Sequence, residues 1–321
     1  DLHLSSRRQR QMCIRDSRTG VPSYRGQRNV FAQFAELQMP LPNDVEVLAS
    51  LRNDHYSDFG NTLHGKLSAK WAPNSQWLVR GAWGSGFRAP AVAQMQDTGK
   101  TIVSSFQSPC TSELLAQATR LGGICPVDGV YNIYSQGSSK LKPELSSQLN
   151  MGLRFMPDRN HTLSVDYWRV DKRDKINSLL DAFPLTNLAR YANNFELNSN
   201  RELQLFTPMI NLGKTQISGF DFSWLVRRPT PWGQLHMGVT GTRVLASRYQ
   251  RAEGQPFESD LNVDSVYSGV VVPKLRSRWH LGLQQESWFW QATLHHTAGH
   301  DTAPFDAVEI DTGKTVTLEH V

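Results

Sequence analysis

Apolar and polar residues alternate along most of the chain, in short stretches separated by turn-forming residues. The clearest stretches cover residues 45–52, 148–155, 234–240 and 274–284, where nearly every second residue is apolar. A period of two places the apolar side chains on one face of a β-strand. Weaker forms of the pattern predict strands at about 28–39, 62–71, 76–86, 161–173, 205–226 (interrupted near Gly213) and 288–298. The sequence therefore predicts an all-β fold, an antiparallel up-and-down meander of about 10–11 strands.

The connections between the predicted strands differ in length. Those near residues 42, 73, 158, 229 and 286 are short, whereas those near 115, 190, 260 and 305 are longer. A transmembrane β-barrel has this arrangement, because short turns join its strands at one rim and long external loops join them at the other. Tryptophans gather near the short turns, at Trp71, Trp77, Trp232, Trp288 and Trp290. Tryptophan favours the boundary between membrane and water, so both patterns indicate an outer-membrane barrel, with ordinary core aromatics under hairpins as the alternative.

One predicted strand has two unlike faces. Lys274, Arg276, Arg278 and His280 occupy one face, and Trp279 with apolar neighbours occupies the other. An Arg or Lys that faces lipid at the membrane centre costs about 2–4 kcal/mol. We therefore expect the charged face to line a wet lumen or a polar plug. A barrel wide enough for such long side chains has many strands.

Composition alone does not separate a soluble protein from a membrane barrel. Hydrophobic residues make up 39% of the 321 residues. No apolar run reaches the roughly 18 residues that a transmembrane helix needs, but a barrel hides its apolar face in every second residue. A soluble all-β carbohydrate-binding domain therefore stays open as an alternative. The net charge of +5 is spread along the chain, which argues against nucleic acid as a partner.

Residues 1–17 differ from the rest of the chain. They show no alternation, and the run from Ser5 to Ser17 resembles translated adapter sequence of the kind found in assembled sequencing reads. The segment also lacks the apolar core of a secretory signal. We expect residues 1–17 to be a non-native or disordered tail, and residues 18–321 to form a partial β-barrel domain.

Two motifs frame a long connection at about 87–143. The first contains Gly84, Gly86, Phe87, Arg88 and Pro90, and the second contains Leu141, Pro143 and Glu144. Gly152 follows on the next predicted strand. In their order and spacing these motifs resemble those of the TonB-dependent outer-membrane receptors, over about residues 25–300. The motif around Arg88 is expected to set the end of a strand and the start of the external loop.

The resemblance implies a 22-stranded barrel filled by an N-terminal plug. Such a receptor imports a scarce ligand, such as siderophore-bound iron, haem, cobalamin or an oligosaccharide, with energy that the TonB complex passes to the plug. This sequence has no plug and too few strands, so it resembles an internal fragment: a partial, open transmembrane barrel. The implied setting is the outer membrane of a Gram-negative cell, in contact with lipid, as a monomer. A passive outer-membrane porin or channel, which would lack a plug, is the alternative.

Cys110 and Cys125 lie in the long connection, each next to a proline. In an oxidising compartment we expect a disulfide that closes this loop and contributes about 3 kcal/mol of stability. Two free thiols are the alternative. A zinc site is not expected, because a pair of cysteines lacks the other ligands of a four-coordinate site.

Ligand contacts are expected from the loops at about 87–143, 174–204 and 250–272. Aromatic residues in these loops are candidates for lining the mouth of the barrel: Phe106, Tyr131, Tyr134, Phe183 and Tyr191. The sequence does not identify the individual residues that bind the ligand.

The sequence predicts neither catalysis nor a cofactor. No nucleophile elbow, phosphate loop or paired-cysteine metal motif is present. Asp166, Asp171 and Asp174 are interpreted as solvated or lumen-facing carboxylates. His295 and His296 are neighbours on a predicted strand, so they point to opposite faces and are not expected to share a metal ion. We therefore expect no enzyme, no metal and no cofactor.

Overall fold

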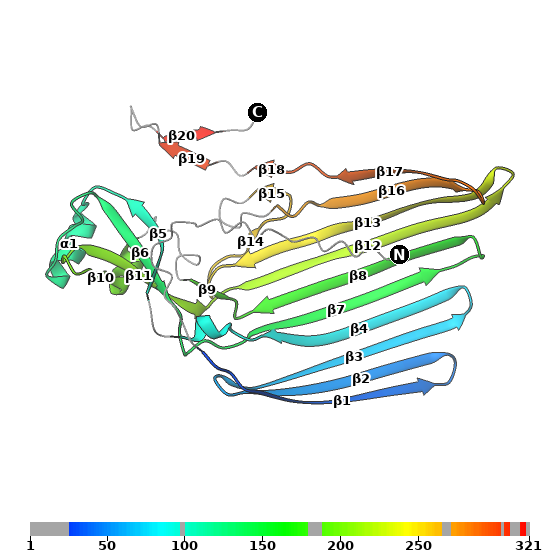
Figure 1. The fold of residues 1–321 in the computed structure, drawn as a ribbon, viewed down its shortest axis with the longest axis horizontal. Coiled ribbons are helices and arrows are strands. Elements are labelled where there is room, and N and C mark those ends of the chain that lie inside the picture. The colour runs from blue at the N-terminus through cyan, green and yellow to red at the C-terminus, as the bar shows by residue number, and fades with distance from the viewer. Residues whose placement is uncertain are drawn as a thin grey trace, which may run out of the picture.

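Most of the protein is one antiparallel sheet (Figure 1). The computed structural model describes residues 26–96, 100–178, 188–264, 271–302, 305–308 and 315–318, so the predicted tail at 1–17 lies outside the described residues. The sheet has 11 strands, with β14 (Glu258–Ser259) paired to β13 beside the main path. Along that path, in spatial order, the strands are β1 (Val30–Leu41), β2 (Val45–Tyr56), β3 (Gly60–Asn74), β4 (Trp77–Arg88), β7 (Glu144–Phe155), β8 (His161–Arg173), β12 (Lys214–Thr230), β13 (Gly233–Gln250), β16 (Leu275–Gln284) and β17 (Phe289–Thr297).

Tight turns join these strands at one end of the sheet, on the right in Figure 1. Between β1 and β2, Asn43 and Asp44 have φ angles of 62° and 58°. Asn and Asp tolerate this left-handed conformation better than most residues with a side chain. At the opposite end the β2–β3 turn is also short, but three other connections are long and cover residues 89–143, 174–213 and 251–274. The predicted contrast between short and long connections is present.

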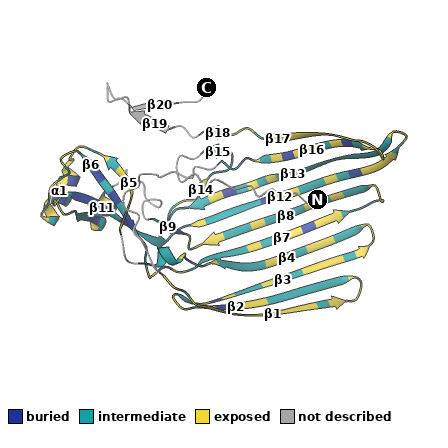
Figure 2. Cartoon of the chain, in the orientation of Figure 1, coloured by how far each residue is buried: buried dark blue, intermediate teal, exposed yellow. Residues whose placement is uncertain are grey.

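The sheet has two unlike faces. Leu67 pairs with Trp83 and Val79 pairs with Leu153, and all four side chains are exposed. We call this the apolar face. The opposite, polar face carries charged residues such as Arg80. Figure 2 shows that the long strands contain few buried residues. A sheet that exposes large apolar side chains on one face has the pattern of a barrel wall that turns this face to lipid.

A second, smaller sheet lies at the end with the long connections. It contains β5 (Thr101–Gln107), β6 (Val130–Gln136), β9 (Ile176–Ser178), β10 (Phe195–Leu197) and β11 (Leu203–Asn211). Helix α1 (Ser112–Leu121) and the 3₁₀ helices η1 (Val92–Met95) and η2 (Leu188–Asn194) belong to the same two connections, and the remaining short strands are β15 (Val263–Asp264), β18 (Asp301–Thr302), β19 (Phe305–Val308) and β20 (Thr315–Leu318). Within the described ranges, no helix is long and apolar enough to cross a membrane.

The predicted fold class, an antiparallel meander of a partial barrel, is confirmed, but one predicted strand is wrong. The sequence predicts a single interrupted strand over residues 205–226. Instead β11 belongs to the second sheet and β12 to the first. Gly213 separates them with a φ of 87°, and a Cβ there would lie 2.5 Å from the backbone oxygen of Gln250. This position requires glycine, and it redirects the chain from one sheet into the other.

Candidate functional site

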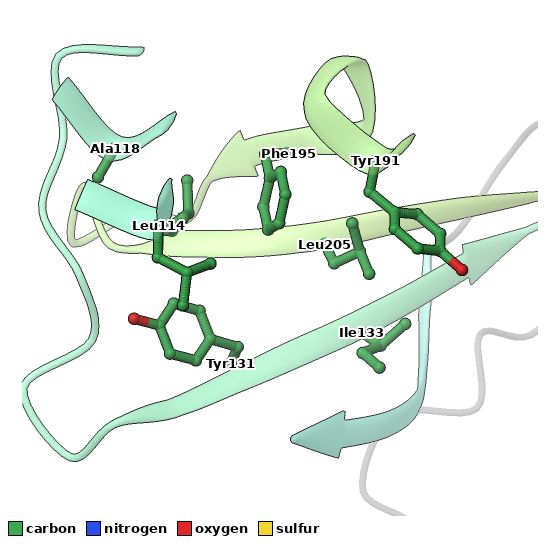
Figure 3. Close-up of a cluster of buried hydrophobic side chains, with 8 residues drawn as sticks. Leu114, Ala118, Tyr131, Ile133, Tyr191, Phe195 and Leu205 are labelled. Carbon is green, nitrogen blue, oxygen red and sulfur yellow. The ribbon is translucent and has the colours of Figure 1, made fainter. Parts of the chain in front are cut away.

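Two connections that are far apart in the sequence fold together at one end of the sheet. We call the unit formed by α1, η2, β5, β6, β9, β10 and β11 the loop layer. Its core consists of Leu114, Ala118, Tyr131, Ile133, Tyr191, Phe195, Leu203 and Leu205, all at most 4% exposed. Figure 3 shows these side chains gathered between α1, β6, β11 and η2. The loop layer thus has a hydrophobic core of its own, which the long sheet lacks.

Backbone pairing joins the two connections. Strands β6 and β11 run parallel, with Ile133 opposite Leu205. The Thr207 hydroxyl donates a hydrogen bond to the Tyr134 carbonyl at 3.1 Å. Nearby, the Leu203 amide donates to the Ile124 carbonyl at 2.9 Å. Along the chain, β6 belongs to the connection from β4 to β7, and β11 belongs to the connection from β8 to β12. The pairing of β6 with β11 therefore holds the two connections together.

A disulfide and a capped helix complete the loop layer. Cys110 and Cys125 are joined by a disulfide that spans 15 residues, with their Cα atoms 5.9 Å apart. Helix α1 lies between them: the Thr111 hydroxyl accepts a hydrogen bond from the Leu114 amide, and Gly122 ends the helix with a φ of 74°. Cys125 packs against the core. The disulfide therefore joins the two segments that flank α1.

The two sequence motifs meet at the base of the loop layer. Arg88 is the last residue of β4 and Glu144 is the first residue of β7, and they are cross-strand partners. The Arg88 guanidinium donates two hydrogen bonds to the Glu144 carboxylate, at 2.8 and 2.5 Å. The same carboxylate accepts a hydrogen bond from the Ile176 amide at 2.8 Å. Glu144 therefore links the end of β4, where the first long connection begins, to Ile176 near the start of the second.

Asn211 makes a second link at this base. Its side-chain oxygen accepts a hydrogen bond from the Lys142 amide at 2.7 Å. Its side-chain nitrogen donates to the carbonyl oxygens of Lys142 and Asp174, both at 2.8 Å. One side chain thus joins the ends of three segments: the return to β7, the exit from β8 and the end of β11. The Asn-Leu-Gly run from 211 to 213 is turn-like, but no pattern in the sequence predicts that Asn211 links these segments.

The other motif residues support the same region. Pro90 and Leu141 are buried, and Pro143 directly precedes β7. Phe87 stacks on His64, with ring centroids 4.6 Å apart. A Cβ at Gly86 would approach the Ser146 hydroxyl to 3.0 Å, whereas one at Gly84 would make only ordinary contacts.

Arg28 fixes the chain at the same rim. Its guanidinium forms an ion pair with Asp58 at 2.6 Å and donates a hydrogen bond to the Pro90 carbonyl at 2.7 Å. It also lies over the rings of Tyr56 and Phe59, at 5.5 and 5.4 Å from their centroids. The β2–β3 turn and the exit from β4 are therefore held together by one side chain.

The third candidate loop, at 250–272, is partly described. Glu258 in β14 forms an ion pair with Arg251 at 2.7 Å, and it accepts a hydrogen bond from the Tyr249 hydroxyl at 2.9 Å. These contacts fold the start of the loop back on β13. Residues 265–270 lie outside the described ranges.

The polar face carries ion pairs and unpaired cations. Arg80 donates two hydrogen bonds to Asp166, at 2.9 and 2.7 Å. Asp221 accepts a hydrogen bond from the Thr242 hydroxyl at 2.6 Å. The Arg276 side chain is exposed and forms no ion pair or hydrogen bond among the described residues.

The structure corrects the expected roles of two aromatic residues. Tyr131 and Tyr191 are fully buried in the loop-layer core and do not line a mouth. Phe106 is partly buried and packs against this core, stacked on Tyr131 with ring centroids 4.9 Å apart. Tyr134 is half-buried, and Phe183 lies outside the described residues. Burial raises the pKa of the Tyr131 hydroxyl above its ordinary value.

The histidines behave as the alternation predicts. His295 pairs with Arg278 and His296 pairs with Ser277, so the two rings occupy successive positions of β17 and point to opposite faces. In the part of the chain that the structure describes, no group of three or more His, Cys, Asp or Glu side chains could hold a metal ion.

These features define a class of protein. A meander with an apolar face, short turns at one end and a folded loop layer at the other has the architecture of an outer-membrane β-barrel wall. Residues 9–314 match the family described as TonB dependent receptor-like, beta-barrel, and the chain belongs to this family. The predicted family is confirmed. The sequence matches no curated protein.

Solved structures of similar fold include siderophore receptors. A variant of the ferric enterobactin receptor PfeA from Pseudomonas aeruginosa, in complex with enterobactin, has a TM-score of 0.59 and 18% identity, covering 84% of this chain and 33% of that one. The siderophore receptor PirA from Acinetobacter baumannii has a TM-score of 0.55 and 15% identity, covering 85% and 35%. PirA from Pseudomonas aeruginosa has a TM-score of 0.53 and 18% identity, covering 84% and 40%. At these identities the likeness shows the fold, and the chain spans well under half the length of each of these structures.

Proposed function

We propose that this chain is part of the barrel of an outer-membrane receptor that imports a ferric siderophore with energy from the TonB complex. In this proposal the barrel wall spans the outer membrane of a Gram-negative cell. The connection at 87–143 is external, and it lies with the 174–204 loop at the ligand entrance. The TonB complex acts through a plug domain, as in other members of the family. The chain itself performs no chemical reaction.

One observation carries this proposal: two long connections form a single folded layer at one end of a barrel wall. A passive channel needs loops that leave its mouth open. A shared core, a parallel strand pair and a disulfide instead build a fixed surface, which can present side chains to a ligand in a defined arrangement. Membership of the TonB-dependent receptor family favours active import over passive diffusion.

The ligand class rests on two further observations. The similar structures include receptors whose ligands are siderophores. On the polar face, Arg276 and Arg278 are exposed and form no ion pair among the described residues. Unpaired cations along a lumen attract an anionic ligand such as a ferric catecholate complex. Haem, cobalamin and oligosaccharides are the other ligands to be tested.

The test is uptake by cells. The full reading frame that contains this chain is expressed in a Gram-negative host without siderophore receptors of its own. Radiolabelled ferric enterobactin is then supplied at low concentration. We expect saturable uptake that disappears in the same host without TonB. Arg276→Glu/Arg278→Glu should weaken uptake, whereas Arg228→Glu, an exposed cation at the short-turn end of the apolar face, should not change it.

Three outcomes would count against the proposal. Uptake that rises linearly with concentration and does not need TonB would identify a passive channel. Saturable uptake of haem, cobalamin or an oligosaccharide, but of no ferric siderophore, would keep the importer and replace the ligand class. No uptake of any of the four, with the receptor present in the outer membrane, would overturn the importer itself.

A further inference from the structure

The apolar face changes its character toward the long connections. Nearer the short turns, the cross-strand pairs on this face are apolar, as in the pair of Tyr167 and Phe220. On β8, β12 and β13 the next rows toward the long connections contain charged side chains. In them Arg169 pairs with Ser218, Asp171 with Gln216 and Arg173 with Lys214, and Gln216 in turn pairs with Arg248. We call Arg169, Arg173, Lys214 and Arg248 the cationic patch.

The patch holds more positive charge than its own partners neutralise. Arg169 forms an ion pair with Asp171 at 2.8 Å. Arg248 donates a hydrogen bond to the neutral side chain of Gln216 at 2.7 Å. Arg173 is 67% exposed and reaches only Asp174, at 4.0 Å. The Lys214 side chain is exposed and has no ion-pair or hydrogen-bond partner among the described residues. Two exposed cations therefore lie side by side at the ends of β8 and β12.

A hollow of about 480 Å³ lies next to these cations. At one side it is lined by the apolar side chains of Leu63, Trp83 and Leu145, and at the other by Arg173 and Lys214. The other lining residues include Ser85, Ser147 and Asp171, and the carboxylate of Asp171 is already paired with Arg169. The hollow therefore has an apolar part and a cationic part.

We propose that the hollow and the cationic patch bind a phosphorylated lipid of the outer leaflet. Its phosphate lies against Arg173 and Lys214, and the start of its acyl chain lies against Trp83 and Leu63. The position fits this ligand, because the patch lies at the long-loop end of the apolar band, where headgroups of the external leaflet meet a barrel wall. Cations near an anionic membrane surface each contribute to such binding. This inference rests on the proposed placement of the sheet in the outer membrane.

The test uses quenching of tryptophan fluorescence. The full receptor is reconstituted in phosphatidylcholine vesicles that contain either phosphatidate or phosphatidylcholine with brominated acyl chains. Brominated chains quench tryptophans that they touch, and the contribution of Trp83 is obtained by difference from Trp83→Phe. We expect Trp83 to be quenched more strongly by brominated phosphatidate than by brominated phosphatidylcholine. Arg173→Glu/Lys214→Glu should abolish this preference, because each lost cation weakens headgroup binding about five-fold.

Arg228→Glu is the matched control, since it makes the same type of charge reversal on the same face of β12, at the short-turn end. It should keep the preference. Equal quenching of Trp83 by both brominated lipids would overturn this inference and leave the proposed function standing. Loss of the preference on addition of inorganic phosphate would show an anion site instead of a lipid site. If neither lipid quenched the tryptophans of the apolar face, the membrane placement would fail and the proposed function with it.

Discussion

The ion pair between Arg80 and Asp166 passes directly over Gly152. Arg80 lies on β4 and Asp166 on β8, and Gly152 lies between them on β7, as the cross-strand partner of both. A Cβ on Gly152 would lie 2.0 Å from a carboxylate oxygen of Asp166 and 2.7 Å from the guanidinium nitrogen of Arg80. The absence of a side chain at position 152 therefore lets two residues interact across a strand that separates them.

Gly152→Ala should break this ion pair. The new methyl group displaces both side chains, and we expect the free energy of unfolding of the full receptor to fall by about 1 kcal/mol or more. Thermal unfolding in detergent measures the change. Gly81→Ala is the control, because a Cβ there would meet only the Asn150 carbonyl oxygen, at 3.9 Å. Equal stability of the two variants would contradict the role assigned to Gly152.

Local patterns in the sequence predicted the wall but not the loop layer. The alternation around Leu149 and Met151 predicts that this segment is a strand and which of its side chains share a face, because a period of two depends only on near neighbours. The burial of Tyr131 and Tyr191 depends on the parallel pairing of β6 with β11, more than 60 residues apart. The separation of β11 from β12 depends on the left-handed backbone of Gly213. The links Arg88–Glu144 and Arg80–Asp166 join residues 56 and 86 positions apart, and no short-range pattern signals such pairs.

Asn211→Ala should loosen the base of the loop layer. It removes three hydrogen bonds that join Lys142 and Asp174 to the end of β11. At about 1 kcal/mol for each bond, the local opening free energy should fall by about 3 kcal/mol. Hydrogen exchange measured by mass spectrometry should speed up around residues 142 and 174. Asn200→Ala is the control, since the Asn200 side chain makes no hydrogen bond within the described ranges. Unchanged exchange at both sites in Asn211→Ala would show that the base is held by other contacts.

Removal of the disulfide should destabilise the loop layer but not the long sheet. Cys110→Ser/Cys125→Ser frees the two segments that flank α1. Closure of a 15-residue loop contributes about 3 kcal/mol, so faster hydrogen exchange is expected in α1 and β6, with β12 and β13 unchanged. A reducing agent should produce the same effect in the native protein and none in the variant. Acceleration that extends equally into β12 would indicate that the wall and the loop layer unfold together.

The loop layer should lose stability in alkali through Tyr131. Burial raises the pKa of this hydroxyl, so the folded state favours the protonated form. Its contribution is fully present below the unfolded pKa of about 10 and is lost as pH rises through the higher, folded pKa. Limited proteolysis of the full receptor should therefore show faster cleavage in the loop layer above about pH 10. Tyr131→Phe provides the control, because phenylalanine cannot ionise and the Tyr131 hydroxyl has no hydrogen-bond partner among the described residues. This variant should be at least as resistant at neutral pH and should lose part of the alkaline sensitivity. If it kept the full sensitivity, other groups would be responsible for the alkaline loss.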